Sequence, residues 1–190
     1  MDRPLYVVDG QNLPLVLLEF LQGGCKSADY NVALATLKRN LSINCNQMLN
    51  DDGDIECDGH MSHDSIALDL ADIRPDVNLN VNHAQAAVVQ QVAADLRQIA
   101  ARFEHDIIAQ ATQNLQRNMK SSPYERWAEH LSREVESAIG RGVCLQDLPQ
   151  ERVIMAVSLT LVKGVCERAP HMLQSLFHVA LQFISYSGRR

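Results

Sequence analysis

The most constraining feature of this sequence is a segment, Glu151 to Arg168, that is apolar on nearly every side of a helix. Its apolar residues are Val153, Ile154, Met155, Val157, Leu159, Leu161, Val162 and Val165. A helix of this kind is buried at the centre of a protein or enters a membrane. With about 13 apolar residues, it is shorter than the roughly 20 that cross a bilayer as a relaxed helix. We therefore expect it to form the buried centre of a soluble fold.

A second apolar segment begins at Pro170 and completes a hairpin with the first. It carries Met172, Leu173, Leu176, Phe177, Ala180, Leu181, Phe183 and Ile184. Helix signals also mark the chain before about residue 42 and again after Asn82, whereas the alternation typical of strands persists nowhere. We predict an all-α bundle of six to eight helices around this central hydrophobic hairpin.

Several boundaries of these helices can be predicted from local signals. Gly23-Gly24 favours termination of a first helix over Leu13–Gln22, and Asp29 can cap a second helix that carries Leu34, Leu37 and Leu41. A long helix opens at Asn82 and breaks somewhere after Phe103. Ser122, with Pro123 and Glu125 behind it, predicts a capping box at the start of a later helix.

Residues 42–80 differ from the rest in composition and charge. Between Asp51 and Asp76 there are nine acidic residues and one basic residue, Arg74, whereas the whole chain has a net charge of −6. A connection of about 40 residues is functional or disordered. We therefore predict N-terminal regulatory helices over 1–41, a flexible acidic loop over 42–80, and a helical core over 81–190 that forms one domain with 1–41.

The composition also excludes several classes of function. An acidic chain lacks the basic face of a nucleic-acid binder. Five scattered cysteines and no convincing signal peptide predict a cytoplasmic protein with reduced thiols. Cys57, His60 and His63 have ligand-like spacing but no second cluster to complete a zinc site. We expect no metal, no cofactor and no catalytic residues, and hence no enzyme.

The acidic segment contains a candidate protease site, Ile55-Glu56-Cys57-Asp58-Gly59. Initiator caspases and granzyme B cut after Asp, and they favour an aliphatic residue four positions upstream, Glu next, and a small residue after the cut. An extended, exposed loop suits a protease cleft. The alternative is an ordinary solvated loop rich in Asp.

An apolar stripe, Val88, Val92, Leu96, Ile99 and Phe103, follows this segment at helical spacing. Such a stripe usually serves an ordinary core. However, Leu96–Phe103 resembles the third homology motif of the Bcl-2 apoptosis family, a helix that docks in partners' grooves. Val92, Leu96, Ile99 and Phe103 match its four anchors and Ala100 its small residue. Ala101 stands where the motif has an Asp that pairs with a groove arginine, so weakened groove binding is expected.

The resemblance to this family extends over nearly the whole chain. The Leu15–Gln22 and Pro170–Ile184 segments are similar to its first helix and its hydrophobic hairpin, and the order of the features agrees. It implies a Bcl-2-like fold and a pro-apoptotic regulator with a partly masked motif helix. The resemblance also implies that the protein, once cut in the acidic loop, acts at the mitochondrial outer membrane. The implied partners are Bax and Bak, anti-apoptotic Bcl-2 relatives, the processing proteases and mitochondrial lipid.

Two other functions remain open from the sequence. One is a plain helical interaction module, in which the stripe is core and the acidic segment a linker. The other is a channel-like protein, in which the hairpin itself inserts into the membrane.

Overall fold

The computed structural model describes residues 12–24, 27–47, 83–142 and 147–187, and all the regular structure in these ranges is helical. The prediction of an all-α bundle of six to eight helices is confirmed. Its helices are α1 (Leu13–Gln22), α2 (Ala28–Gln47), α3 (His83–Ala101), α4 (His105–Ser121), α5 (Trp127–Arg141), α6 (Gln150–Arg168) and α7 (Leu173–Ser187), with 3-10 turns at Tyr124–Arg126 and Pro170–Met172.

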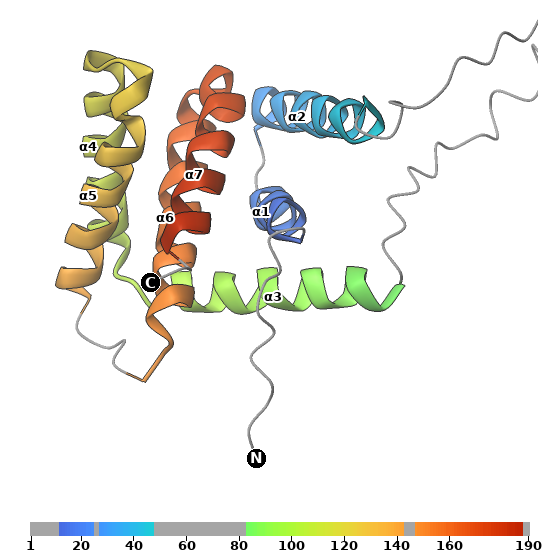
Figure 1. The fold of residues 1–190 in the computed structure, drawn as a ribbon. Coiled ribbons are helices and arrows are strands. Elements are labelled where there is room, and N and C mark those ends of the chain that lie inside the picture. The colour runs from blue at the N-terminus through green and yellow to red at the C-terminus, as the bar shows by residue number, and fades with distance from the viewer. Residues whose placement is uncertain (1–11, 25–26, 48–82, 143–146, 188–190) are drawn as a thin grey trace, which may run out of the picture.

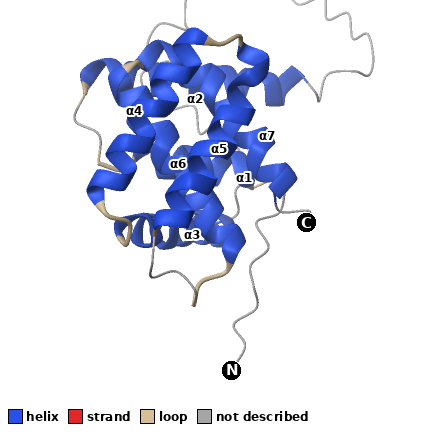
Figure 2. Cartoon of the chain, turned by 90° about the vertical axis from the view of Figure 1, so that its left-hand side faces the viewer, coloured by secondary structure: helices blue, strands red, loops and turns tan. Residues whose placement is uncertain are grey.

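Helix α6 is the centre of the molecule, because it packs against α1, α3, α4, α5 and α7. Figure 1 shows α4 and α5 side by side on one flank of the α6–α7 hairpin, with α1 and α2 on the other. Helix α3 runs across one end of this arrangement, beneath α1 and α6. Figure 2 shows the same bundle from the side of α4 and α5.

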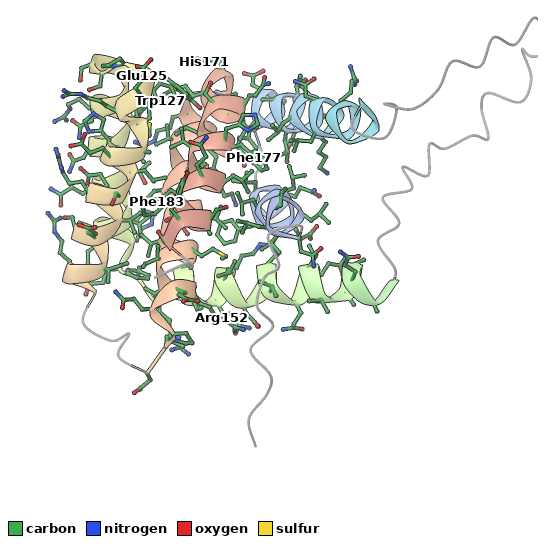
Figure 3. The ribbon with its side chains drawn as sticks, in the orientation of Figure 1. Glu125, Trp127, Arg152, His171, Phe177 and Phe183 are labelled. Carbon is green, nitrogen blue, oxygen red and sulfur yellow. The ribbon has the colours of Figure 1, made fainter. Side chains whose placement is uncertain are left out.

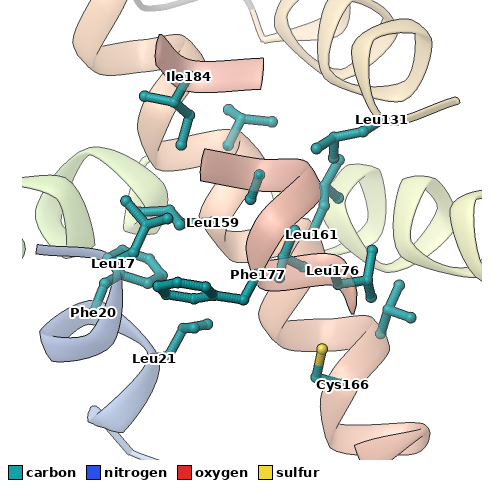
Figure 4. Close-up of a cluster of buried hydrophobic side chains, with 14 of the residues drawn as sticks. Leu17, Phe20, Leu21, Leu131, Leu159, Leu161, Cys166, Leu176, Phe177 and Ile184 are labelled. Carbon is teal, nitrogen blue, oxygen red and sulfur yellow. The ribbon is translucent and has the colours of Figure 1, made fainter. Parts of the chain in front are cut away.

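The predicted hairpin forms the core. Nine α6 residues from Val153 to Cys166 are buried, including Leu159 and Leu161, which are fully enclosed. Figure 4 shows Phe177 of α7 facing Leu17, Phe20 and Leu21 of α1 across this core. Because five other helices pack against α6, its buried residues are not confined to one stripe, which explains why the α6 sequence carries no polar face.

The ends of α1 agree with the sequence, and two other predicted helix starts do not. Gly24 adopts a φ of 77° after α1, a conformation that glycine reaches without steric cost. Asp29 lies inside the first turn of α2, where Tyr30 N approaches Ser27 Oγ at 3.5 Å. The capping box predicted at Ser122 is wrong: a 3-10 turn precedes α5, and Ser122 Oγ pairs instead with His130 Nε2 at 2.9 Å.

Helix α2 continues to Gln47, six residues into the segment predicted as loop from position 42. The rest of the acidic segment, with the protease motif and the Cys57, His60 and His63 group, lies outside the described residues. The predicted division of the chain into regulatory helices, loop and core stays a prediction.

Candidate functional site: helix α3

The predicted motif residues lie on α3 and in the turn that follows it. We call Val88, Val92, Leu96, Ile99 and Phe103 the anchor face. Leu96 and Ile99 expose only 1% and 6% of their surface, and Val92 and Phe103 are also buried. Val88 is half-buried at the edge of the core. In the intact chain, the anchor face is thus turned into the protein's own core.

The helix ends earlier than the apolar spacing predicts. Helix α3 stops at Ala101, and Phe103 lies in a closing turn in which Arg102 N donates to Ile99 O and Phe103 N donates to Ala100 O. Phe103 therefore reaches the core from outside the helix. The prediction of one continuous helix through all five anchors is wrong for this state of the chain.

Two buried residues of the same face were missed from the sequence. Val89 and Ala93 are buried beside Val92 and Leu96. Together they complete the i, i+3, i+4, i+7 pattern of a helix that buries a broad face. Val89 lies next to a motif position rather than on one, and Ala93 is small, although an alanine at helical spacing is an equally good signal of close packing.

Helices α1 and α6 cover the anchor face. Helix α1 buries its own apolar stripe in the same core: Leu13, Val16, Leu17, Phe20 and Leu21. Burying apolar side chains of this size contributes about 1.5–3 kcal/mol each relative to leaving them in water. Helix α1 therefore covers α3 with an apolar stripe of its own.

Polar contacts tie α3 to its neighbours along its length. Gln85 Nε2 donates to Asn12 Oδ1 near the start of α3. Asp95 pairs with Arg152 of α6 at 3.8 Å, and Figure 3 shows Arg152 at the end of α6 next to α3. Arg97 Nη2 donates to the backbone carbonyl of Glu19, and its Cζ lies 5.8 Å from the centre of the Phe20 ring. These pairs join distant parts of the sequence, so helical periodicity could not reveal them.

The two alanines of the motif are placed differently from the anchors. Ala100 is partly buried against the core, whereas Ala101 is exposed to solvent. Ala101 therefore contributes little to the packing of the bundle. A side chain at this position can be changed without disturbing the anchor face.

Neither a metal site nor a membrane-spanning helix is found in the described ranges. In residues 12–24, 27–47, 83–142 and 147–187, no three histidine, cysteine, aspartate or glutamate side chains form a group that could hold a metal ion. No helix in the same ranges is both long enough and apolar enough to cross a bilayer.

Comparison with known proteins decides the family. The family model described as BH3 interacting domain (BID) matches residues 9–187. The chain belongs to the BID family. BH3-interacting domain death agonist of Gallus gallus is 25% identical to this chain over an alignment of 190 positions, which covers 97% of this chain and 93% of the relative. No solved structure matches this chain.

The BID-family match includes every described helix and also the acidic segment between α2 and α3. Residues 55–59 thus fall within the matched region. The order of the features along the chain predicted membership in the Bcl-2 apoptosis family, and this prediction is confirmed.

Proposed function

We propose that this chain is a pro-apoptotic regulator rather than an enzyme: a latent groove ligand that a protease cut activates. Family membership and the name of the chicken relative, BH3-interacting domain death agonist, support this role. Once released, α3 engages the grooves of Bax, Bak and anti-apoptotic Bcl-2 relatives at the mitochondrial outer membrane. An initiator caspase, or granzyme B, makes the cut after Asp58.

The observation that carries the proposal is the burial of the anchor face beneath a helix from the other side of the protease motif. Helix α1 precedes Asp58 in the chain and α3 follows it. Leu96 and Ile99 cannot enter a partner's groove while α1 and α6 enclose them. When only a small fraction of the molecules has the anchor face exposed, the apparent affinity for a partner is lower than the intrinsic affinity in proportion to that fraction.

Cutting between α1 and α3 changes how often α1 returns to its place. In the intact chain α1 is tethered, so its return is an intramolecular step with a high effective concentration. After the cut, a departed α1 returns only by diffusion. At low protein concentration the cut therefore favours the exposed anchor face, with no change in any α1–α3 contact.

The cut also separates two pieces of different charge. Residues 1–58 carry nine acidic and four basic residues, a net charge of −5, which leaves −1 on residues 59–190. Repulsion from anionic lipid contributes about 1 kcal/mol per charge near a membrane surface. Loss of the acidic piece therefore favours the approach of the C-terminal piece to a mitochondrial membrane.

A binding experiment tests this function. Calorimetry would compare a peptide of residues 88–106, the intact chain and the cut chain as ligands of an anti-apoptotic Bcl-2 relative. We expect the intact chain to bind at least about tenfold more weakly than the cut chain, because its anchors are covered. Equal binding by intact and cut chains would reject the masking, and a peptide that does not bind would reject groove recognition.

Isolated mitochondria separate this function from a channel-like one. The cut chain is expected to permeabilise mitochondria that contain Bax or Bak and to leave mitochondria lacking both intact. Permeabilisation without either protein would instead favour direct insertion of the α6–α7 hairpin.

A further inference from the structure

The C-terminal end of α1 presents a local problem that the helix does not solve by itself. The last turn of any helix leaves backbone carbonyls without partners in the helix. Basic side chains often satisfy them, but α1 has no basic residue in its last turn. Its end is partly buried, so unpaired carbonyls would be costly here.

Three other helices supply the missing donors. Arg97 of α3 donates to the carbonyl of Glu19, and Lys163 of α6 donates to the carbonyl of Gly23. The hydroxyl of Tyr30 in α2 donates to the carbonyl of Leu21 at 2.9 Å. We call these three donor–carbonyl pairs the α1 carbonyl junction. Two of the three donors are cations, which the negative end of the helix dipole also attracts.

We propose that the α1 carbonyl junction is the polar latch that keeps α3 masked, and that Arg97 is its release point. This inference rests on the proposed function only in its last step, the binding of a partner. Arg97 follows the anchor Leu96 directly in the sequence, so α3 cannot leave the bundle while the guanidinium holds Glu19 O. Breaking this bond leaves a partly buried carbonyl of α1 without its donor and loosens both helices together.

The guanidinium is held in a way that makes release possible. Arg97 Nη2 is bonded to Glu19 O and Arg97 Cζ lies 5.8 Å from the centre of the Phe20 ring, but Arg97 Nε is buried with no hydrogen-bond partner in the described part of the chain. A buried donor without a partner lowers the stability of the state that contains it. Nε regains water when α3 leaves, which offsets part of the bond lost at Nη2.

The guanidinium of Arg97 fits against α1 because residue 23 is a glycine and has no side chain. A Cβ at position 23 would lie 2.5 Å from Arg97 Nε and 2.8 Å from its Cζ, closer than real Cβ contacts come. The backbone of Gly23 has a φ of −69°, which alanine adopts without strain. Alanine at this position therefore displaces the flexible end of Arg97 and leaves the α3 sequence unchanged.

The test compares hydrogen exchange of the full, uncut chain with that of Gly23→Ala. Because a hydrogen bond from a charged donor is lost, protection of α1 and α3 amides should fall by about ten- to a hundredfold. Protection of α4 and α5 should stay unchanged. Gly140→Ala is the matched control, since its Cβ would meet nothing within 4 Å. Unchanged α3 protection, or an equal loss across α4 and α5, would overturn the latch.

A second variant approaches the junction from α3. Arg97→Met keeps an apolar contact with Phe20 but cannot donate to Glu19 O, so it should open α1 and α3 as Gly23→Ala does. Binding to an anti-apoptotic Bcl-2 relative should strengthen in both uncut variants by about the same factor as the loss of protection. The 88–106 peptide with and without Arg97→Met is measured in parallel. Any difference in affinity between these two peptides is a direct effect of residue 97 on groove binding and is subtracted.

The two measurements separate the latch from the proposed function. Faster exchange in α1 and α3, with no binding by variant or peptide, would support the latch and reject groove recognition. Peptide binding with unchanged exchange and unchanged binding of both uncut variants would support groove recognition and reject the latch.

Discussion

Ala101 stands where the groove-binding motif predicted from the sequence has an Asp, and the bundle does not need a particular side chain at this position. It is exposed in the intact chain, at the last position of α3. Alanine has the highest helix propensity, and a carboxylate at a helix C-terminus opposes the helix dipole by about 0.3–1 kcal/mol. The residue therefore suits the masked state better than the motif Asp would.

Ala101→Asp should strengthen groove binding. A hydrogen bond between the new carboxylate and the groove arginine contributes about 1.5–3 kcal/mol, which is about ten- to a hundredfold or more in Kd. Calorimetry of the 88–106 peptide, with and without Ala101→Asp, measures this difference. Asp95 cannot take the same part, because it lies on another side of α3, paired with Arg152 and Gln91. An Asp peptide that binds no tighter would mean that the motif is out of register and that the stripe is plain core.

Leu159 tests the centrality of α6 at a single side chain. It is fully buried, so Leu159→Ala removes packed methyl groups and leaves a cavity inside the bundle. We expect a loss of roughly 2–5 kcal/mol in the free energy of unfolding, measured by denaturant melts. Val32→Ala is the control: Val32 exposes 67% of its surface on α2, and its truncation should change stability by less than about 0.5 kcal/mol.

At the scale of helices, local signals in the sequence predicted the elements better than their junctions. The C-terminal end of α1 was predicted correctly because a pair of glycines follows it. The α6–α7 hairpin was predicted correctly because the apolar residues of α6 extend around more than one face of the helix. The break between α3 and α4 contains neither Gly nor Pro. It depends on Phe103 turning back into the core, which is a tertiary contact. The same limit applies to the donors of the α1 carbonyl junction, which lie up to 140 positions from their acceptors.

The α6–α7 hairpin carries its own probe of opening in Cys166. Burial raises the pKa of this thiol, and the neighbouring Glu167 carboxylate raises it further. Since the thiolate is the reactive form, Cys166 should resist alkylation at pH 7 to 9 while α6 stays packed. In a variant with serine at the other four cysteines, labelling should be slow in water and become fast across the unfolding transition. Rapid labelling under native conditions would show that the hairpin opens without global unfolding.

On the scale of the whole molecule, the arrangement of helices assigns opposite roles to the two sides of Asp58. The N-terminal side contributes α1 and α2, and α1 both covers the anchor face and draws donors from α3 and α6. The C-terminal side contains the anchor face and the apolar hairpin. A single cut between them would therefore break the covalent link between α1 and the anchor face that it covers, without removing any contact between them.

The position of that cut is the last prediction. An initiator caspase should cut the chain once, between Asp58 and Gly59, because Ile55 and Glu56 supply the upstream residues that it favours and Gly59 offers no steric hindrance. Asp58→Glu keeps the charge but adds a methylene to a side chain that the protease pocket fits closely, so cutting should largely stop. Mass spectrometry of the digest gives the position, and Asp72→Glu serves as the matched control that should be cut like the parent chain. A main product ending at Asp72 or Asp76 would move the cut and refute the assignment of residues 55–59. Because Asp72 and Asp76 also precede α3, that result would still leave the α1 mask on the opposite side of the cut from the anchor face.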